Sequence, residues 1–272
     1  MKPLKIAKKS AFYLLLILLA FIFCLPLGYA IYNSLLPLDK VNTLASITDF
    51  TLDYYVELFT TRPVWRWLSN TVLMAVFTLL GQLTTSLLGG YALAKLRFPG
   101  RKIVYTIVLI TLMIPFQVLL TPLYITVAKL KWVNTITGLT VPFLMNSLYI
   151  FMARQFFVTL PDDLIEAARI DGLGHAGTFF RIALPMAKSI IVTIIIFNFT
   201  QSWNAYLVPS TFSTTEEHYT LVVGLNTLKD TYFNRTNLTM AGVVVITLPV
   251  LVLFLFLQKH FIQGVATSGM KE

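Results

Sequence analysis

The densest group of ionisable side chains in the sequence lies at residues 161–172, between two long apolar stretches. Its members are four carboxylates and one guanidinium: Asp162, Asp163, Glu166, Asp171 and Arg169. Side chains of these types recognise a partner through ionic contacts and charge-assisted hydrogen bonds. We therefore expect this acidic segment to hold a binding partner outside the apolar stretches.

The acidic segment carries the start and stop signals of a short helix. Thr159 is a candidate N-cap, and Asp162 three residues later completes the pattern of a capping box. Acidic side chains in the first turn are favoured by the helix dipole. Gly172 permits the left-handed conformation that commonly ends a helix. We expect a second short helix near residues 175–183 and the next apolar stretch from about Pro185.

Two neighbouring alanines occupy the middle of this predicted helix. Ala167 and Ala168 leave the backbone accessible to a closely approaching partner surface. Glu166 and Arg169, one turn apart, can pair with each other or with opposite charges on a partner. The alternative is a helix that lies on the inner leaflet of a membrane, but such helices are usually rich in Lys and Arg. The acidic composition therefore favours protein docking.

The composition of the whole chain is that of a membrane protein. Of 272 residues, 57% are hydrophobic and only 12% are charged, against about 25% in soluble domains. Six windows contain no Asp, Glu, Lys or Arg, and each can hold one helix of about 20 apolar residues but not two. We predict an all-α fold with six transmembrane helices near residues 12–35, 69–94, 104–128, 133–154, 187–208 and 239–259.

The distribution of Lys and Arg predicts the orientation of these spans. With the N-terminus inside, 14 of the 21 basic residues fall on the inner side, together with the loop of residues 155–186. Residues 1–272 are thus predicted to form a single transmembrane domain with both termini cytoplasmic. The formal net charge of +9 is then a topology signal. No cluster of aromatic and basic residues indicates a nucleic-acid surface.

The chain lacks groups that an independent transporter or an enzyme would need. The interiors of the predicted spans hold no Asp, Glu, Lys, Arg or His for proton or ion coupling. His175, His218 and His260 are too scattered to hold a metal or to activate a nucleophile. The GxxxxGK(S/T) phosphate-binding motif is missing as well. We predict no catalytic residue, metal or cofactor in this chain, so that energy for uphill transport must come from another subunit.

Several motifs together resemble those of a known family. The sequence resembles the cytoplasmic EAA loop of permease subunits of bacterial ATP-binding-cassette (ABC) importers at Glu166-Ala167-Ala168-x-x-Asp171-Gly172 and Arg181-Ile182-x-Leu184-Pro185. It is similar to the carbohydrate-uptake class at residues 91–101, Met113-Ile114-Pro115-Phe116-Gln117, Pro122-Leu123-Tyr124, Arg154-Gln155-Phe156-Phe157, Ser202-Trp203-Asn204 and Gln258-Lys259-x-Phe261-Ile262-x-Gly264. The length and the six predicted spans resemble the smaller, maltose-type inner-membrane permease. The sequence departs from the class at Ser189, where a second proline is common, and at Ala205, where an acidic residue is common.

This resemblance implies a transport subunit of the bacterial inner membrane. It implies that the loop docks on a cytoplasmic ATPase dimer, which binds ATP and Mg²⁺, through eight residues: Glu166, Ala167, Ala168, Arg169, Asp171, Gly172, Arg181 and Pro185. A second permease, a different chain or another copy, would complete the pore within the membrane lipid. An extracytoplasmic binding protein would deliver a sugar or oligosaccharide. The alternatives are a permease for a polyol or glycerol-phosphate, a stand-alone secondary transporter and a membrane scaffold.

Polar residues within the spans are candidates for the substrate pathway. Sugars are bound by amide hydrogen bonds and aromatic stacking, and the candidate residues of this kind are Asn198, Gln201, Ser202, Trp203, Asn204 and Gln117. The alternative for the 187–208 span is packing, since such side chains also hydrogen-bond across helices for about 0.6–2 kcal/mol each. The alternative for Gln117, between Pro115 and Pro122 in a span expected to be kinked, is to satisfy backbone groups freed at the kink. Close helix packing is expected at Gly81, Ser86, Gly89 and Gly90.

Overall fold

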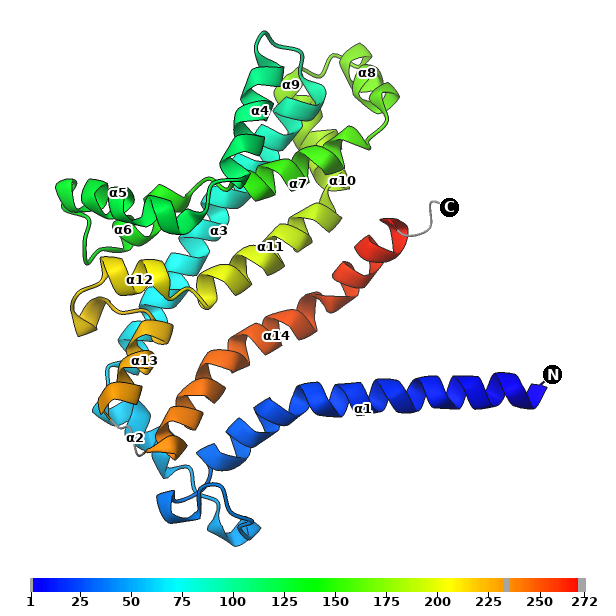
Figure 1. Ribbon diagram of the computed structural model, residues 1–272. Helices are drawn as coiled ribbons and strands as arrows, with labels where there is room; N and C mark the ends of the chain where they lie inside the picture. Colours follow the sequence, from blue (N-terminus) through cyan, green and yellow to red (C-terminus); the bar gives the residue numbers. More distant parts are fainter. Residues whose placement is uncertain (1, 232–234, 269–272) are drawn as a thin grey trace. The chain divides into compact units, whose positions relative to one another are not determined.

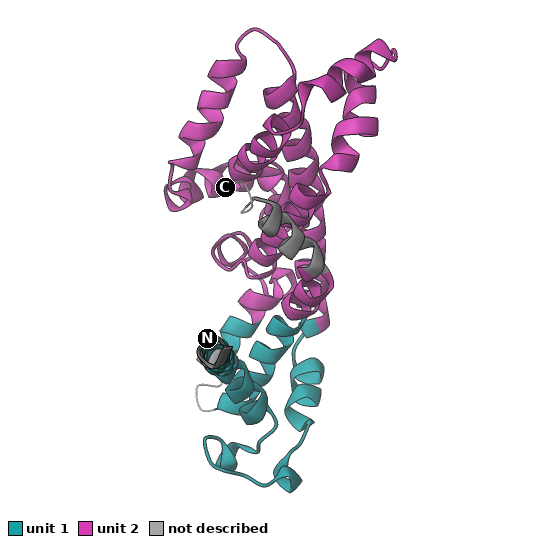
Figure 2. Ribbon diagram, turned by 90° about the vertical axis from the view of Figure 1, so that its right-hand side faces the viewer, with its two compact units in different colours: residues 1–64, 225–248 teal, residues 65–224, 249–272 magenta. Residues whose placement is uncertain are grey.

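The computed structural model describes residues 2–231 and 235–268, and every regular element in this part of the chain is a helix. The chain forms two compact units, Met1–Val64 with Leu225–Leu248 and Trp65–Gly224 with Pro249–Glu272 (Figure 2). The predicted all-α class is confirmed for the described residues. Residue 1 and residues 269–272 lie outside them, and the cytoplasmic location of both termini stays a prediction.

Unit 1 combines a long apolar helix with a smaller polar region that follows it (Figure 1). Its elements are α1 (Lys2–Ser34), η1 (Leu38–Lys40), η2 (Ile47–Asp49), α2 (Asp53–Thr61), the end of α13 (Leu221–Thr231) and the first part of α14 (Thr236–Ser268). In the polar region, Lys40 donates to Asp49 at 2.6 Å. This hydrogen bond raises the pKa of Lys40 and lowers the pKa of Asp49.

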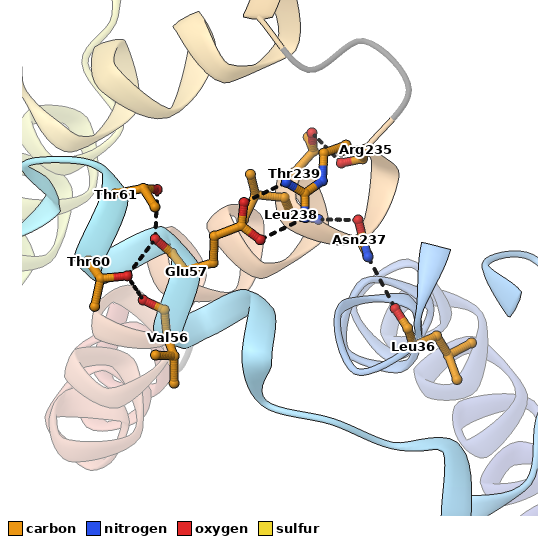
Figure 3. Close-up of polar contacts among 9 residues, drawn as sticks. All are labelled: Leu36, Val56, Glu57, Thr60, Thr61, Arg235, Asn237, Leu238 and Thr239. Atoms are coloured by element: carbon orange, nitrogen blue, oxygen red, sulfur yellow. Dashed lines mark hydrogen bonds and ion pairs between the residues drawn. The ribbon is translucent and has the colours of Figure 1, made fainter. Parts of the chain in front are cut away.

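The guanidinium of Arg235 joins the start of α14 to α2 (Figure 3). Its Nη1 and Nη2 donate to Oε1 and Oε2 of Glu57 at 2.5 and 2.6 Å, and it lies 5.8 Å from the centre of the Tyr54 ring. Nearby, the buried Asn237 donates from Nδ2 to the carbonyl of Leu36 at 3.3 Å. These bonds tie α2, α14 and the segment after α1 together within unit 1.

Unit 2 contains the acidic segment and the other helices of the chain (Figure 1). Its elements are α3 (Val64–Lys95), α4 (Arg101–Leu112), α5 (Phe116–Lys129), α6 (Ile136–Thr140), η3 (Val141–Phe143), α7 (Ser147–Val158), α8 (Asp162–Ile170), α9 (His175–Thr178), η4 (Phe179–Ala183), α10 (Leu184–Met186), α11 (Lys188–Trp203), α12 (Leu207–Phe212), η5 (Glu216–His218), the first part of α13 and the last part of α14.

Three of the predicted spans fall on single helices of spanning length. These are residues 12–35 in α1, residues 69–94 in α3 and residues 239–259 in α14. Each helix contains an uninterrupted stretch that is long and apolar enough to cross a bilayer: Lys9–Ser34, Val64–Lys95 and Thr236–Phe256. Helices that satisfy their own backbone hydrogen bonds are the expected solution in hydrocarbon.

Bends interrupt two of the other predicted spans, and a third bend lies at the start of the predicted 187–208 span. α4 and α5 meet at 101°, α6–η3 and α7 at 42°, and the α9–α10 stretch and α11 at 75°. Among the residues that the structure describes, three helices are thus long and apolar enough to cross a bilayer, or up to six if each bent pair counts as one span. The kink expected in the 104–128 span is found at Pro115, the N-cap of α5, where the missing N–H and the restriction on the preceding residue end α4. Pro122 lies inside α5.

The buried cluster next to the acidic segment, called here the core of unit 2, joins α3, α7, α8, η4 and α11. Its members are Leu87, Tyr91, Tyr149, Ala153, Phe157, Leu160, Ile165, Phe179, Ala183, Ala187, Ile190 and Ile194. Next to it, α3 and α7 approach closely at Gly90, where an added Cβ would lie 2.6 Å from that of Ala153. The close packing expected at this glycine is confirmed.

The Glu57–Arg235 pair should stabilise unit 1 measurably, because its side chains are only 28% and 30% exposed. We expect Glu57→Gln to lower the free energy of unfolding by about 1–2 kcal/mol, as for a charge-assisted pair partly screened by water. Thermal unfolding of the purified protein in detergent measures this. Asp39→Asn, at an exposed carboxylate of the same unit, should change stability by less than about 0.5 kcal/mol. A Glu57→Gln protein as stable as the unmodified chain would contradict the expectation.

Candidate functional site

The acidic segment folds into α8, which has one buried and one exposed face. Ile165 and Ala168 are 5% and 4% exposed and pack toward the core of unit 2. Their spacing of three residues places both on the same side of a helix. The other residues of α8 are exposed: Asp162, Asp163, Leu164, Glu166, Ala167, Arg169 and Ile170. A short helix with two buried apolar side chains thus presents a mixed polar surface to its surroundings.

α8 ends in the left-handed turn predicted at Gly172, whose φ is 81°. The N–H of Leu173 bonds to the carbonyl of Ala168 at 3.0 Å, and that of Gly172 to the carbonyl of Arg169 at 3.0 Å. These two bonds make up a Schellman motif. The second short helix predicted near 175–183 is confirmed as α9 followed by η4, whose bonding pattern is that of a π-helix.

The start of α8 differs from the predicted capping box. Pro161 is the N-cap, and no side chain caps the helix. The Thr159 hydroxyl instead donates to the carbonyl of Phe156 at 2.7 Å. The Asp162 carboxylate accepts from Nζ of Lys95 at 2.6 Å. The capping-box prediction is therefore wrong, because a lysine from the distant end of α3 takes the carboxylate that the box would have used.

Lys95 also stabilises the charged form of Asp162. The hydrogen bond from Lys95, together with its positive charge and that of Arg97, lowers the pKa of the Asp162 carboxyl. The Asp162 side chain is 78% exposed, so water screens part of this attraction. Asp162 is consequently ionised at neutral pH and contributes a fixed negative charge at the start of α8.

Two charges on the exposed face of α8 do not pair with each other. Within residues 2–231 and 235–268, the Glu166 carboxylate has no hydrogen-bond or ion-pair partner. The Arg169 guanidinium lies 3.4 Å from Nδ1 of His175. Glu166 can thus accept hydrogen bonds from a partner without first breaking one within the chain.

The remaining residues predicted for docking divide between the surface and the core. Those that are exposed are Glu166, Ala167, Arg169, Asp171, Gly172, Arg181 and Pro185. Ala168 alone is buried, on the face that packs toward the core. Of the two alanines, only Ala167 therefore offers a partner close approach to the helix backbone.

The polar residues predicted for a substrate pathway do not share one face of α11. Asn198 is 1% exposed and donates to Oε1 of Gln82 on α3 at 2.6 Å. Gln82 in turn donates to the carbonyl of Phe143 at 2.6 Å. The buried amides of Asn198 and Gln82 thus connect α11, α3 and η3 in series. The Asn198 amide thus joins helices to one another, which is the packing alternative rather than a place on the substrate pathway.

Other members of the set point in different directions. Ser202 lies 3.1 Å from the hydroxyl of Thr78 on α3, and Gln201 accepts from the Tyr149 hydroxyl of α7 at 3.1 Å. Trp203 is buried and stacks on Phe199 with ring centres 5.3 Å apart. Asn204 on α11 and Gln117 on α5 are exposed, as is Gln201. The exposed amides of Gln117, Gln201 and Asn204 therefore remain the candidates for contact with a substrate.

Sequence reasoning missed the partners of these residues on α3. Thr78, Gln82 and Ser86 are all buried. They are spaced four residues apart, which aligns them on one face of the helix. A polar residue at every fourth position of an otherwise apolar helix is a signal that could have identified this face as a helix contact.

Comparison with known proteins identifies relatives of the chain. A family model described as "Binding-protein-dependent transport system inner membrane component" matches residues 86–267. The chain is 35% identical over 269 residues to the arabinooligosaccharides transport system permease protein AraQ of Bacillus subtilis, covering 98% of this chain and 96% of that protein. It is 36% identical over 208 residues to the sn-glycerol-3-phosphate transport system permease protein UgpE of Escherichia coli O157:H7, covering 76% and 74%.

A solved structure has the same fold. It is described as a bacterial ABC transporter involved in the import of the acidic polysaccharide alginate. The match has a TM-score of 0.81 with 21% sequence identity, and covers 94% of this chain and 96% of that one. At this identity the likeness concerns the fold alone.

If Asn198 serves packing, its replacement should affect stability before transport. We expect Asn198→Ala to lower the free energy of unfolding by about 1–3 kcal/mol, because it leaves the buried Gln82 oxygen without a donor. Thermal unfolding in detergent measures the loss. Asn204→Ala, at the exposed amide of the residue that caps the end of α11, is the matched control and should be close to neutral. An Asn198→Ala protein of normal stability with altered substrate affinity would instead place Asn198 on the pathway.

Proposed function

Because the chain belongs to the family of binding-protein-dependent transport system inner membrane components, we propose that α8 couples it to a cytoplasmic ATPase and that its cargo is an oligosaccharide. The chain is the permease subunit of an ABC importer and a multi-pass protein of the inner membrane. The ATPase is a separate subunit, and family membership implies a binding protein as well. A stand-alone secondary transporter and a scaffold are thereby set aside.

The two faces of α8 support the coupling role. Ile165 belongs to the core cluster of unit 2, and Ala168 is buried on the same side of the helix, so a force applied to α8 acts on the helices that form this core. The opposite face keeps the unpaired carboxylate of Glu166 and the small side chain of Ala167 exposed. An exposed helix with an unused charge and a site of close backbone approach suits insertion into a groove on a protein partner.

The proposed roles of the other subunits complete the assembly. We infer that a second permease, either a different chain or another copy, supplies the other half of the pore. ATP and Mg²⁺ bind to the ATPase dimer, and this chain takes part in hydrolysis only through the contact at α8. The binding protein delivers cargo on the extracytoplasmic side. With this arrangement, both termini and the loop of residues 155–186 are cytoplasmic.

Two considerations favour an oligosaccharide over glycerol-phosphate or a polyol. The AraQ relatives, which are named for arabinooligosaccharide transport, match 93–98% of the chain, whereas the UgpE relatives match 76%. A phosphate ester needs cationic partners when it leaves water, and the six uncharged windows provide none in this chain. The exposed amides of Gln117, Gln201 and Asn204 and the exposed Tyr206 suit a neutral, hydroxyl-rich cargo.

Enlarging Ala167 tests the docking role directly. Ala167→Leu should reduce ATP-dependent uptake about tenfold, because a bulky side chain at a tight contact costs about 1–3 kcal/mol. Uptake and ATPase activity are measured on the complete importer in liposomes. Ala128→Leu, at an exposed alanine near the end of α5, makes the same change away from α8 and should be neutral. Normal uptake by the Ala167→Leu importer would refute docking through this face.

A competition assay tests the cargo class. The complete importer with its binding protein should take up labelled neutral oligosaccharides in an ATP-dependent manner. Glycerol-3-phosphate in about tenfold excess should leave this uptake unchanged, because the uncharged spans offer the phosphate no cationic partner. Liposomes without ATP give the background. Uptake of labelled glycerol-3-phosphate, or inhibition by it, would overturn the assignment to oligosaccharides.

A further inference from the structure

Lys95 occupies an unusual position for a lysine near a membrane surface. It is the last residue of α3, and its side chain is only 6% exposed. Its Nζ donates to the carbonyl of Leu160 at 2.6 Å and to Oδ1 of Asp162 at 2.6 Å. We call this pair of bonds the Lys95 bridge. It joins the end of a spanning helix to the residues on either side of Pro161, where α8 begins.

The general bias of basic residues toward the inner side does not explain the Lys95 bridge. That bias requires only that a cation be near the surface, and Arg97 after α3 and Lys102 in the first turn of α4 meet it while exposed to water. A buried ammonium group loses its hydrogen bonds to water, and hydrogen bonds within the protein must replace them. Nζ of Lys95 donates such hydrogen bonds to one carbonyl and one carboxylate, both at the start of α8.

The Lys95 bridge constrains α8 in a way that its apolar contacts do not. Ile165 and Ala168 hold the middle of the helix by nondirectional contacts, which tolerate small sliding or rolling. Hydrogen bonds of 2.6 Å are directional and fix distance and register. The start of α8 therefore cannot shift relative to the end of α3 without breaking a bond to a buried cation.

We propose that Lys95 is a positioning residue for ATPase coupling: through the Lys95 bridge, a displacement of α8 is passed to α3. The proposal deepens the proposed function and rests on the docking role of α8. It makes Lys95 necessary for the efficiency with which ATP hydrolysis is converted into transport. Lys95 is not required for assembly with the ATPase, which involves the opposite, exposed face of α8.

The test measures cargo imported per ATP hydrolysed by the complete importer in liposomes. Lys95→Met keeps an unbranched side chain but removes all three donors, and should lower this ratio about tenfold, a common size for coupling between sites. Lys95→Arg restores charge and donors and should recover most of the ratio. Lys102→Met removes an exposed lysine in the first turn of α4 and should leave the ratio unchanged. Co-purification with the ATPase should be normal in all three.

A second variant keeps the test decisive if Lys95→Met does not fold. Asp162 is 78% exposed, so Asp162→Lys should fold, yet it places a positive charge against Lys95 and should also lower the ratio. A normal ratio in both variants would overturn the proposal, as would a loss of uptake matched by an equal loss of assembled complex. Ala167→Leu separates the docking role of α8 from the positioning role of Lys95. If Ala167→Leu uncouples transport while the Lys95 and Asp162 variants do not, only the Lys95 proposal fails. If none uncouples, α8 is not the docking element.

Discussion

The functional arrangement of this protein depends on the packing of one side of α8 against an aromatic-rich core. Tyr91 of α3, Phe157 of α7 and Phe179 of η4 form a triangle of rings, with centres 5.5, 5.1 and 6.4 Å apart. Ile165 belongs to the same cluster. Without this contact, the acidic segment would be a surface loop with no influence on the spans. With it, a polar helix is held where it can bind a partner and act on the helices of unit 2.

Different forces stabilise the packing of α8 and the contacts between the predicted spans. At α8, which the proposed function places outside the hydrocarbon, burial of Ile165 would remove apolar surface from water and so be driven by the hydrophobic effect. Between spans, lipid is as apolar as the side chains, so association relies on close approach and interhelical hydrogen bonds. The structure has both, in the contact at Gly90 and in the buried Gln82–Asn198 amide pair. Small residues and amides between spans are therefore as informative as the apolar cluster at α8.

The sequence predicted features that depend on local patterns and failed where a distant residue intervened. Apolar runs are local, so α1, α3 and α14 were located correctly, and Gly172 ends α8 as its type suggests. The capping box failed because Lys95, 67 positions away, bonds to Asp162. Ile165 is buried in a cluster assembled from five elements, and helical spacing alone could not say that Ala168 rather than Ala167 would share its buried side. Pro115 predicted a kink, but the presence of a proline does not give the size of the bend, which is 101° between α4 and α5.

In unit 2, α3, α8 and α11 are each connected to the other two, by hydrogen bonds or through the chain. α3 is joined to the start of α8 by the Lys95 bridge, and the chain runs from α8 through α9, η4 and α10 into α11. α11 returns to α3 through the bonds of Asn198 to Gln82 and of Ser202 to Thr78. The bend between α10 and α11, at Ala187, is itself buried in the core, so flexing there would disturb close packing. A displacement at α8 therefore acts on α3 and α11 together, which favours rigid movement of these helices over a local hinge.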